Sequence, residues 1–349
     1  MNTINFDPNG LGMANGNLYG LPFSVEEAKL VIIPVPWEVT VSYRAGTADG
    51  PQAILDASLQ VDLFDEEIPD AWKLGIAMLP ISTEIREKSD NLRTKATIII
   101  EALENEAEAS TYVHLYEEIN REGEALKNNL CEIALNLMRQ GKKVALLGGD
   151  HSTPLGLMQA FAQEYEEYGI LHIDAHCDLR EAYEGFTYSH ASIMYNALAF
   201  PQISKLVQVG IRDFCEAEAQ LAQDSEGRVV IHSHREMAKA RFVGKTWEEI
   251  CEKIVVQLPE NVYISFDIDG LDPALCPNTG TPVAGGLQLE EAMFLIEKVV
   301  TSGRTIIGFD LNEVAPNPNG EDEWDANVGA RVLYRLCNFM GKSHRYLLG

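Results

Sequence analysis

The chain has 349 residues, of which 46 % are hydrophobic, and it carries a formal net charge of −26. An acidic chain lacks the basic face that nucleic-acid binding requires, so we expect no nucleic-acid partner. The sequence contains no apolar run of 18 residues and no secretory signal pattern, so we expect neither a membrane span nor export. The six cysteines form no CxxC pair, which is typical of reduced thiols in the cytoplasm.

Residues 1–25 are rich in Asn and Gly, which predicts an irregular N-terminal arm before a single domain over residues 26–349. Within that domain, apolar runs alternate with helical patterns. Buried strands are predicted at 29–37, 143–150, 169–178, 205–213, 228–233, 262–270 and 305–314, and helices at 116–140, 155–166, 246–257 and 288–302. This alternation predicts an α/β fold in which helices cover both faces of a parallel sheet. We interpret the charged stretch 83–127 as a helical excursion with solvated faces.

Polar side chains gather where several of these strands end, which is where open α/β sheets bind their ligands. The segment LHIDAHCDLR places Asp174, His176 and Asp178 two residues apart, so an extended chain would project them to the same side. The segment SFDIDGLDP repeats this spacing with Asp267 and Asp269. A third segment, GGDHS at 148–152, adds a histidine after another strand.

Together the three segments offer four carboxylates and two imidazoles, from His151, Asp174, His176, Asp178, Asp267 and Asp269. Burying such charges costs several kcal/mol or more unless something pairs with them. Oxygen ligands combined with imidazole suit Mn²⁺ or a similar first-row ion, and four carboxylates balance two divalent cations. We therefore predict a two-metal centre, and we expect Cys177 to point away from it into the core.

The motifs GGDHS, DAHCD and SFDIDGLDPALCPNTGTPVAGGL resemble the signature motifs of the arginase/agmatinase (ureohydrolase) family, most of all those of bacterial agmatinases. The resemblance extends from SYRAGTADGPQAI (42–54) to GFDLNEVAP (308–316). It implies a single three-layer α/β/α domain with a central, mostly parallel sheet. It also implies two Mn²⁺ ions, with Ni²⁺ as the alternative, and hydrolysis of a guanidino compound to urea and an amine.

By motif position, the resemblance implies that one ion is held by His151, Asp174, Asp178 and Asp267. It implies that the other is held by Asp174, His176, Asp267 and Asp269, so that Asp174 and Asp267 bridge the pair. Two ions would lower the pKa of bound water and supply a hydroxide for attack on the guanidinium carbon. Family members form trimers or hexamers, so we expect a homo-oligomer in which residues 1–25 pack on a neighbouring subunit.

Two further residues match the family's catalytic positions. Glu313, in DLNEVAP, matches the glutamate that binds the guanidinium group, and a carboxylate suits that planar cation. His190, in YEGFTYSHASIMY, matches the loop histidine that shuttles a proton. We interpret His114, His172 and His344 as structural, and His232 and His234 as surface residues at the end of a strand.

The loop after Asp178 indicates the substrate. Arginases hold an α-amino acid there with a Ser- and Asn-rich stretch, whereas residues 179–190 read LREAYEGFTYSH. This difference favours agmatine, hydrolysed to putrescine and urea, with Glu184 as an acceptor for the distal amine. The alternative hypothesis is that Trp37 and Tyr43 lie at the mouth of the pocket and shorten it, which would favour hydrolysis of free guanidine. A metal-binding homologue without catalysis is a third hypothesis, and Glu313 and His190 argue against it.

Overall fold

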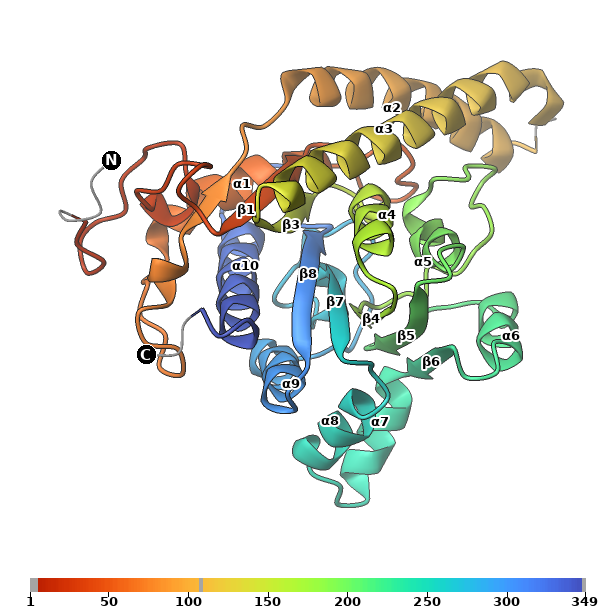
Figure 1. Ribbon diagram of the computed structural model, residues 1–349. Coiled ribbons are helices and arrows are strands. Elements are labelled where there is room, and N and C mark those ends of the chain that lie inside the picture. Colours follow the sequence, from red (N-terminus) through yellow and green to blue (C-terminus); the bar gives the residue numbers. More distant parts are fainter. Residues whose placement is uncertain (1–5, 107–108, 347–349) are drawn as a thin grey trace.

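The computed structural model describes residues 6–106 and 109–346, and it is built around one eight-stranded parallel sheet (Figure 1). The strand order is β2-β1-β3-β8-β7-β4-β5-β6. The strands are β1 (Leu30–Val35), β2 (Ile76–Met78), β3 (Lys143–Gly148), β4 (Tyr168–Ile173), β5 (Ile203–Val209), β6 (Val229–His232), β7 (Asn261–Asp267) and β8 (Thr305–Asn312). Each predicted strand overlaps one of these. The prediction missed β2, whose three residues are too few to show a pattern.

Helices cover both faces of the sheet, which confirms the predicted three-layer α/β/α fold (Figure 1). One apolar core lies under α1 (Gly50–Ala57), α8 (Trp247–Val255), α9 (Leu289–Thr301) and α10 (Trp324–Ser343). A second lies under α2 (Thr83–Glu104), α3 (Val113–Arg139), α4 (Leu155–Glu164) and α5 (Ile193–Ala197). The short helices α6 (Glu216–Asp224) and α7 (His234–Phe242) lie beside β6, at one end of the sheet. None of the helices in the described part of the chain is long and apolar enough to cross a membrane.

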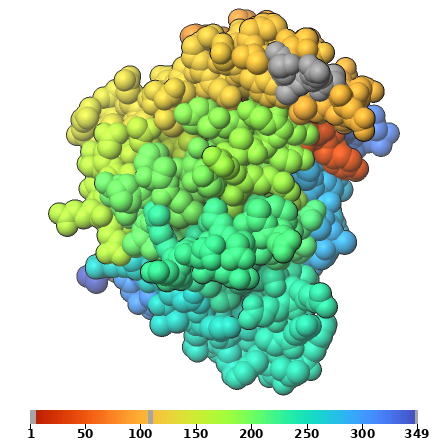
Figure 2. Space-filling view, turned by 90° about the vertical axis from the view of Figure 1, so that its right-hand side faces the viewer, coloured from red at the N-terminus to blue at the C-terminus, as the bar shows by residue number. Residues whose placement is uncertain are grey.

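The charged excursion forms α2 and α3, which pair along the upper edge of the molecule in Figures 1 and 2. Ser82 begins α2 by accepting a hydrogen bond from the Ile85 amide (3.2 Å). Arg93, on α2, donates hydrogen bonds to the carbonyls of Val39 and Val41. The excursion thereby holds the loop that follows β1.

The N-terminal segment differs from the predicted arm. Leu18, Tyr19 and Leu21 are buried in the chain's own core, and Leu18–Gly20 form a short 3-10 helix. The hydroxyl of Tyr19 donates to the Ala330 carbonyl of α10 (3.0 Å). Residues 18–21 are therefore buried within the chain itself, and the packing of residues 1–25 on a neighbouring subunit stays a prediction. Residues 1–5 lie outside the described part.

The topology brings the predicted site residues to one edge of the sheet. Strands β3, β8, β7, β4 and β5 are consecutive neighbours, and parallel strands end on the same side. His151 follows β3, Asp174 follows β4, Asp267 ends β7, and Glu313 follows β8. Residues separated by up to 162 positions in the sequence therefore meet at the centre of the sheet.

Gly149 shows how tightly the chain packs at this edge. A Cβ atom at this position would lie 2.0 Å from the carbonyl oxygen of Trp37. That carbonyl accepts a hydrogen bond from the Asp150 amide, and the Gly149 carbonyl accepts one from the Glu313 amide (both 2.8 Å). Glycine is thus required for the close approach of three segments that carry site residues.

We predict that Gly149→Ala lowers the free energy of unfolding by about 3 kcal/mol or more, because the added methyl group forces backbone segments apart. Urea denaturation of the metal-free protein measures this change. Gly141→Ala is the control. A Cβ atom at this position would meet nothing within 4 Å, so we expect the free energy of unfolding to fall by only about 1–2 kcal/mol, because of the left-handed φ of +79°. Equal losses in the two variants would contradict the packing argument.

Candidate metal centre

The imidazole of His151 lies at the centre of a cluster of carboxylates. Its Nδ1 is 3.0 Å from Asp174 Oδ2, 3.2 Å from Asp267 Oδ2 and 3.3 Å from Asp178 Oδ2. All four side chains are at least 94 % buried. These are the four residues predicted to hold the first ion, and the structure brings them together.

A second group surrounds His176. Its Nδ1 lies 3.1 Å from Asp269 Oδ2 and 3.5 Å from Asp174 Oδ1. Asp267 is joined to this group through Oδ1, which accepts the amide hydrogen of Asp269 (2.8 Å). Asp174 therefore contacts both imidazoles through different oxygens, as a bridging carboxylate would.

Hydrogen bonds determine which nitrogen of the His151 ring donates a hydrogen bond to Ser265 and which one faces the carboxylates. The hydroxyl of Ser265 donates to Asp310 Oδ1 (3.0 Å), so its oxygen is left to accept a hydrogen bond from His151 Nε2 (2.9 Å). Nε2 therefore carries a proton. Nδ1 is the nitrogen that faces the carboxylates, and a neutral His151 ring would offer its lone pair there. A histidine ligand to a metal needs this tautomer.

The backbone at two of these residues is strained. Asp178 has φ +54° and Glu313 has φ +63°, in the left-handed region that non-glycine residues rarely occupy. Each such residue costs about 1–3 kcal/mol, and strain of this kind clusters at functional sites. In both residues the left-handed backbone conformation places the carboxylate at the same edge of the sheet.

The cluster carries more negative charge than a buried site tolerates without cations. Burial and the nearby charges of Asp269 and Asp174 raise the pKa of Asp267 well above its usual value. Burial and Asp174 raise the pKa of Asp178 to about 6. Burial alone would lower the pKa of His151, but its hydrogen bonds to the carboxylates raise it well above normal.

The donor set fits divalent metal ions. Two subsets place their ligand atoms close enough to hold an ion, one with His151, His172, Asp174 and Asp178 and one with Asp174, His176 and Asp269. The buried Asp269 Oδ2 accepts no hydrogen bond from the described residues, which leaves it available to a cation. The Cys177 thiol lies in the hydrophobic core, as predicted, so the donors are carboxylates and imidazoles.

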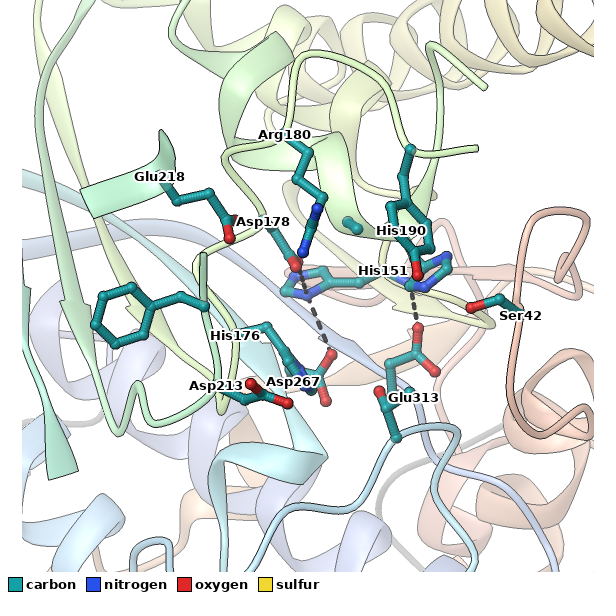
Figure 3. A pocket seen from close by; sticks show the side chains of 14 residues that line it. Ser42, His151, His176, Asp178, Arg180, His190, Asp213, Glu218, Asp267 and Glu313 are labelled. Atoms are coloured by element: carbon teal, nitrogen blue, oxygen red, sulfur yellow. Dashed lines mark hydrogen bonds and ion pairs between the residues drawn. The ribbon is translucent and has the colours of Figure 1, made fainter. Parts of the chain in front are cut away.

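A cavity of about 180 Å³ opens onto this cluster (Figure 3). The residues that line it are Ser42, His151, His176, Asp178, Arg180, Tyr183, His190, Ala191, Asp213, Phe214, Glu218, Asp267, Thr281 and Glu313. In Figure 3, Glu313 lies on one side of the cluster and Asp213 on the other. Glu313 Oε1 accepts the His151 amide hydrogen (2.8 Å), which orients this carboxylate towards the cluster.

Comparison with known proteins identifies the family. A family model described as Arginase family matches residues 28–338. The chain belongs to the arginase family. An N(1)-aminopropylagmatine ureohydrolase from Thermus thermophilus is 33 % identical over 90 % of this chain and 92 % of its own. An agmatinase from Halalkalibacterium halodurans is 30 % identical over 83 % of this chain and 85 % of its own.

A solved structure has the same fold. The agmatine ureohydrolase of Thermoplasma volcanium superposes with a TM-score of 0.72, covering 96 % of this chain and 97 % of that one, at 22 % sequence identity. At this identity the likeness concerns the fold alone. Membership of the arginase family rests on the family model and on the sequence relatives.

Three residues predicted to bind the substrate of this arginase-family protein do not line the cavity. The Trp37 side chain packs in the hydrophobic core, because its backbone is held against Gly149. Tyr43 is 68 % exposed and its ring faces the guanidinium of Arg44. Glu184 lies in a turn beside Tyr116, where burial raises the pKa of its carboxyl.

Sequence analysis also missed residues that the arginase-family fold brings to the site. Asp213 follows β5 and lines the cavity, and its position after the strand segment KLVQVGIRD was the available signal. His172 was interpreted as structural, yet its Nε2 lies 2.8 Å from Asp174 Oδ2. Ser265 and Asp310 contact His151 from two neighbouring strands, and no local pattern in the sequence links them.

We predict that Asp269→Asn removes mainly one of two bound ions, because Asp269 contacts His176 and belongs to the second group. Elemental analysis after dialysis should fall from two ions per chain to about one. Asp272→Asn, in the same loop, is the control and should retain both. Retention of two ions by Asp269→Asn would contradict the assignment.

Proposed function

We propose that this arginase-family protein hydrolyses agmatine, or an agmatine extended at its amine end, to urea and a polyamine. The observation that carries the proposal is the juxtaposition of the carboxylate–imidazole cluster with Glu313 in one cavity. A guanidinium group held by Glu313 would lie directly beside the cluster. In the overall reaction, water adds its oxygen to the guanidinium carbon, the bond to the tail nitrogen breaks, and that nitrogen leaves as an amine.

The six cluster residues would hold two divalent ions, with Asp174 and Asp267 shared between them. When bound, such ions supply water activation at neutral pH. We propose Mn²⁺, because four of the six ligands are carboxylates, and Ni²⁺ as the alternative, because imidazole also suits nickel.

Glu313 and His190 have separate roles in this proposal. Glu313 is fixed through Oε1, so Oε2 is left to pair with the substrate guanidinium. His190 lines the cavity, and its Nδ1 lies 3.4 Å from Thr40 Oγ1. Burial lowers the pKa of His190 to about 3, so the ring is neutral at pH 7. A neutral ring can accept the proton that water loses and pass it to the departing amine.

The opposite side of the cavity suits a cationic tail. Asp213 is an exposed carboxylate there, and the neighbouring Phe214 also lines the cavity, whereas the Tyr183 ring packs edge-on against His190 (ring centroids 5.9 Å apart). Amines pair with such carboxylates, and aromatic faces attract cations. The Arg180 guanidinium, which would repel a cation, lies over the ring of Tyr183 (5.0 Å to the centroid).

Two substrates therefore deserve direct comparison. Agmatine has one distal amine, whereas N1-aminopropylagmatine carries an additional aminopropyl group, and relatives of this chain are named for each. Free guanidine has no tail. The structural argument for guanidine was a pocket shortened by Trp37 and Tyr43, and neither side chain lines the cavity.

We further propose a cytoplasmic homo-oligomer, a trimer or a hexamer. Six free cysteines, five of them buried, support a reducing compartment. Phe242 ends α7, Val243 follows it and Val256 follows α8, and all three side chains are between 71 % and 85 % exposed, which supports contact with another subunit.

The test is urea release by Mn²⁺- and Ni²⁺-loaded protein with guanidine, agmatine, N1-aminopropylagmatine and arginine at equal concentration. The proposal predicts turnover of agmatine or its aminopropyl derivative, with the matching polyamine as product and negligible turnover of guanidine. Guanidine turnover that excess agmatine does not inhibit would overturn the substrate assignment. Urea release from none of these compounds would favour a metal-binding homologue without catalysis.

The same assay tests whether the amine tail of the substrate binds beside Asp213. Asp213→Asn should raise KM for the preferred amine substrate about tenfold with little change in kcat, because the lost contact binds substrate and transition state alike. Asp224→Asn, at an exposed carboxylate of α6, is the matched control. An unchanged KM in Asp213→Asn would place the tail elsewhere.

A further inference from the structure

His172 occupies an unusual position for a core histidine. It lies on β4, is fully buried, and precedes Asp174 by two residues. Its Nε2 is 2.8 Å from Asp174 Oδ2, the same oxygen that lies 3.0 Å from His151 Nδ1. His172 therefore contacts the carboxylate that the two halves of the metal centre share.

Gln208 is the cross-strand partner of His172 on β5, and it is also fully buried. Its Nε2 donates a hydrogen bond to the carbonyl of Cys177 (2.6 Å), and the same nitrogen lies 2.9 Å from His172 Nδ1. A carbonyl can only accept, so the contact with Cys177 identifies this atom as the amide nitrogen. Its second hydrogen is then directed at His172 Nδ1.

This geometry determines the tautomer of His172. Because Nδ1 accepts from Gln208, the ring proton lies on Nε2 and is donated to Asp174. The protonated Nε2 offers no lone pair to an ion, so His172 cannot act as His151 does. Its role towards the centre is to hold a ligand.

The side-chain oxygen of Gln208 is unpaired, which indicates that the side chain is present for the hydrogen bonds of its amide nitrogen. Gln208 Oε1 is buried and has no hydrogen-bond partner among the described residues. Leaving a buried acceptor unpaired is unfavourable, and an apolar side chain would avoid that cost. Against that cost, glutamine at position 208 provides two hydrogen bonds donated by Nε2, which an apolar side chain could not donate.

We propose that His172, oriented by Gln208, is a positioning residue of the metal centre that fixes the plane of the Asp174 carboxylate. Asp174 Oδ1 accepts the His176 amide hydrogen (2.6 Å), and Oδ2 accepts from His172. With both oxygens held, each faces a different half of the centre. The inference rests on the proposed two-metal centre and goes beyond it by assigning a residue outside the six ligands.

The matched variants are His172→Leu, which removes the donor, and His172→Gln, whose side-chain amide nitrogen can replace Nε2 as a donor to Asp174. Gln208→Met removes the group that sets the tautomer while keeping the shape of the side chain. His232→Leu is the control, because His232 is also a buried strand histidine bonded to a glutamine, Gln257, but contacts none of the carboxylates.

The experiment titrates each metal-free protein with Mn²⁺ and follows free Mn²⁺ and the spin-coupled pair by electron paramagnetic resonance. Thermal unfolding in EDTA establishes that each metal-free variant is folded. Loss of a hydrogen bond to a metal ligand typically costs 10–100-fold in affinity. We therefore expect a loss of that size in His172→Leu, a smaller loss in Gln208→Met, substantial recovery in His172→Gln and no change in His232→Leu.

The outcomes separate this inference from the proposed function. If the wild-type protein binds no Mn²⁺ pair, the proposed centre itself fails. If the wild-type protein binds the pair and His172→Leu binds it equally well, the positioning role is refuted. If His172→Leu does not fold, Gln208→Met decides: unchanged affinity in that variant overturns the proposal.

Discussion

The structure is organised around four carboxylates buried in contact with two imidazoles. At pH 7 such a group is unstable unless cations neutralise it, and burial together with neighbouring carboxylates raises the pKa values of Asp178 and Asp267. Divalent ions are the simplest source of the missing positive charge. The same arrangement that requires cations also makes the site chemically useful, because ions held there lie beside a carboxylate suited to a guanidinium group.

The rest of the fold serves to hold this group in place. Among five adjacent parallel strands, β3, β4 and β7 deliver the six ligands, and β8 and β5 deliver Glu313 and Asp213, to one edge of a sheet that is packed on both faces. Glycine at position 149 permits three segments to approach closely, and Arg93 ties the loop after β1 to helix α2. A rigid frame of this kind keeps the carboxylates together despite their mutual repulsion, and it stores the backbone strain seen at Asp178 and Glu313.

Much of this could be predicted from the sequence, because strands buried on both faces read as continuous apolar runs and because metal ligands occur as short local motifs. The missed features depend on tertiary contacts. Trp37 looked like a residue of the pocket mouth, but its backbone is held against Gly149 and its side chain turns into the core. His172 gains its role from Gln208 on the neighbouring strand, and Asp213 enters the cavity because β5 adjoins β4. No spacing within one segment reveals such pairings.

Anomalous diffraction at the manganese edge from crystals of the Mn²⁺-loaded protein tests the central claim most directly, because it locates ions without reference to activity. The account predicts two peaks at the carboxyl edge of the sheet, one in contact with His151 and Asp178 and the other with His176 and Asp269, both in contact with Asp174 and Asp267. A single peak at full loading, or peaks that touch none of these carboxylates, would contradict it.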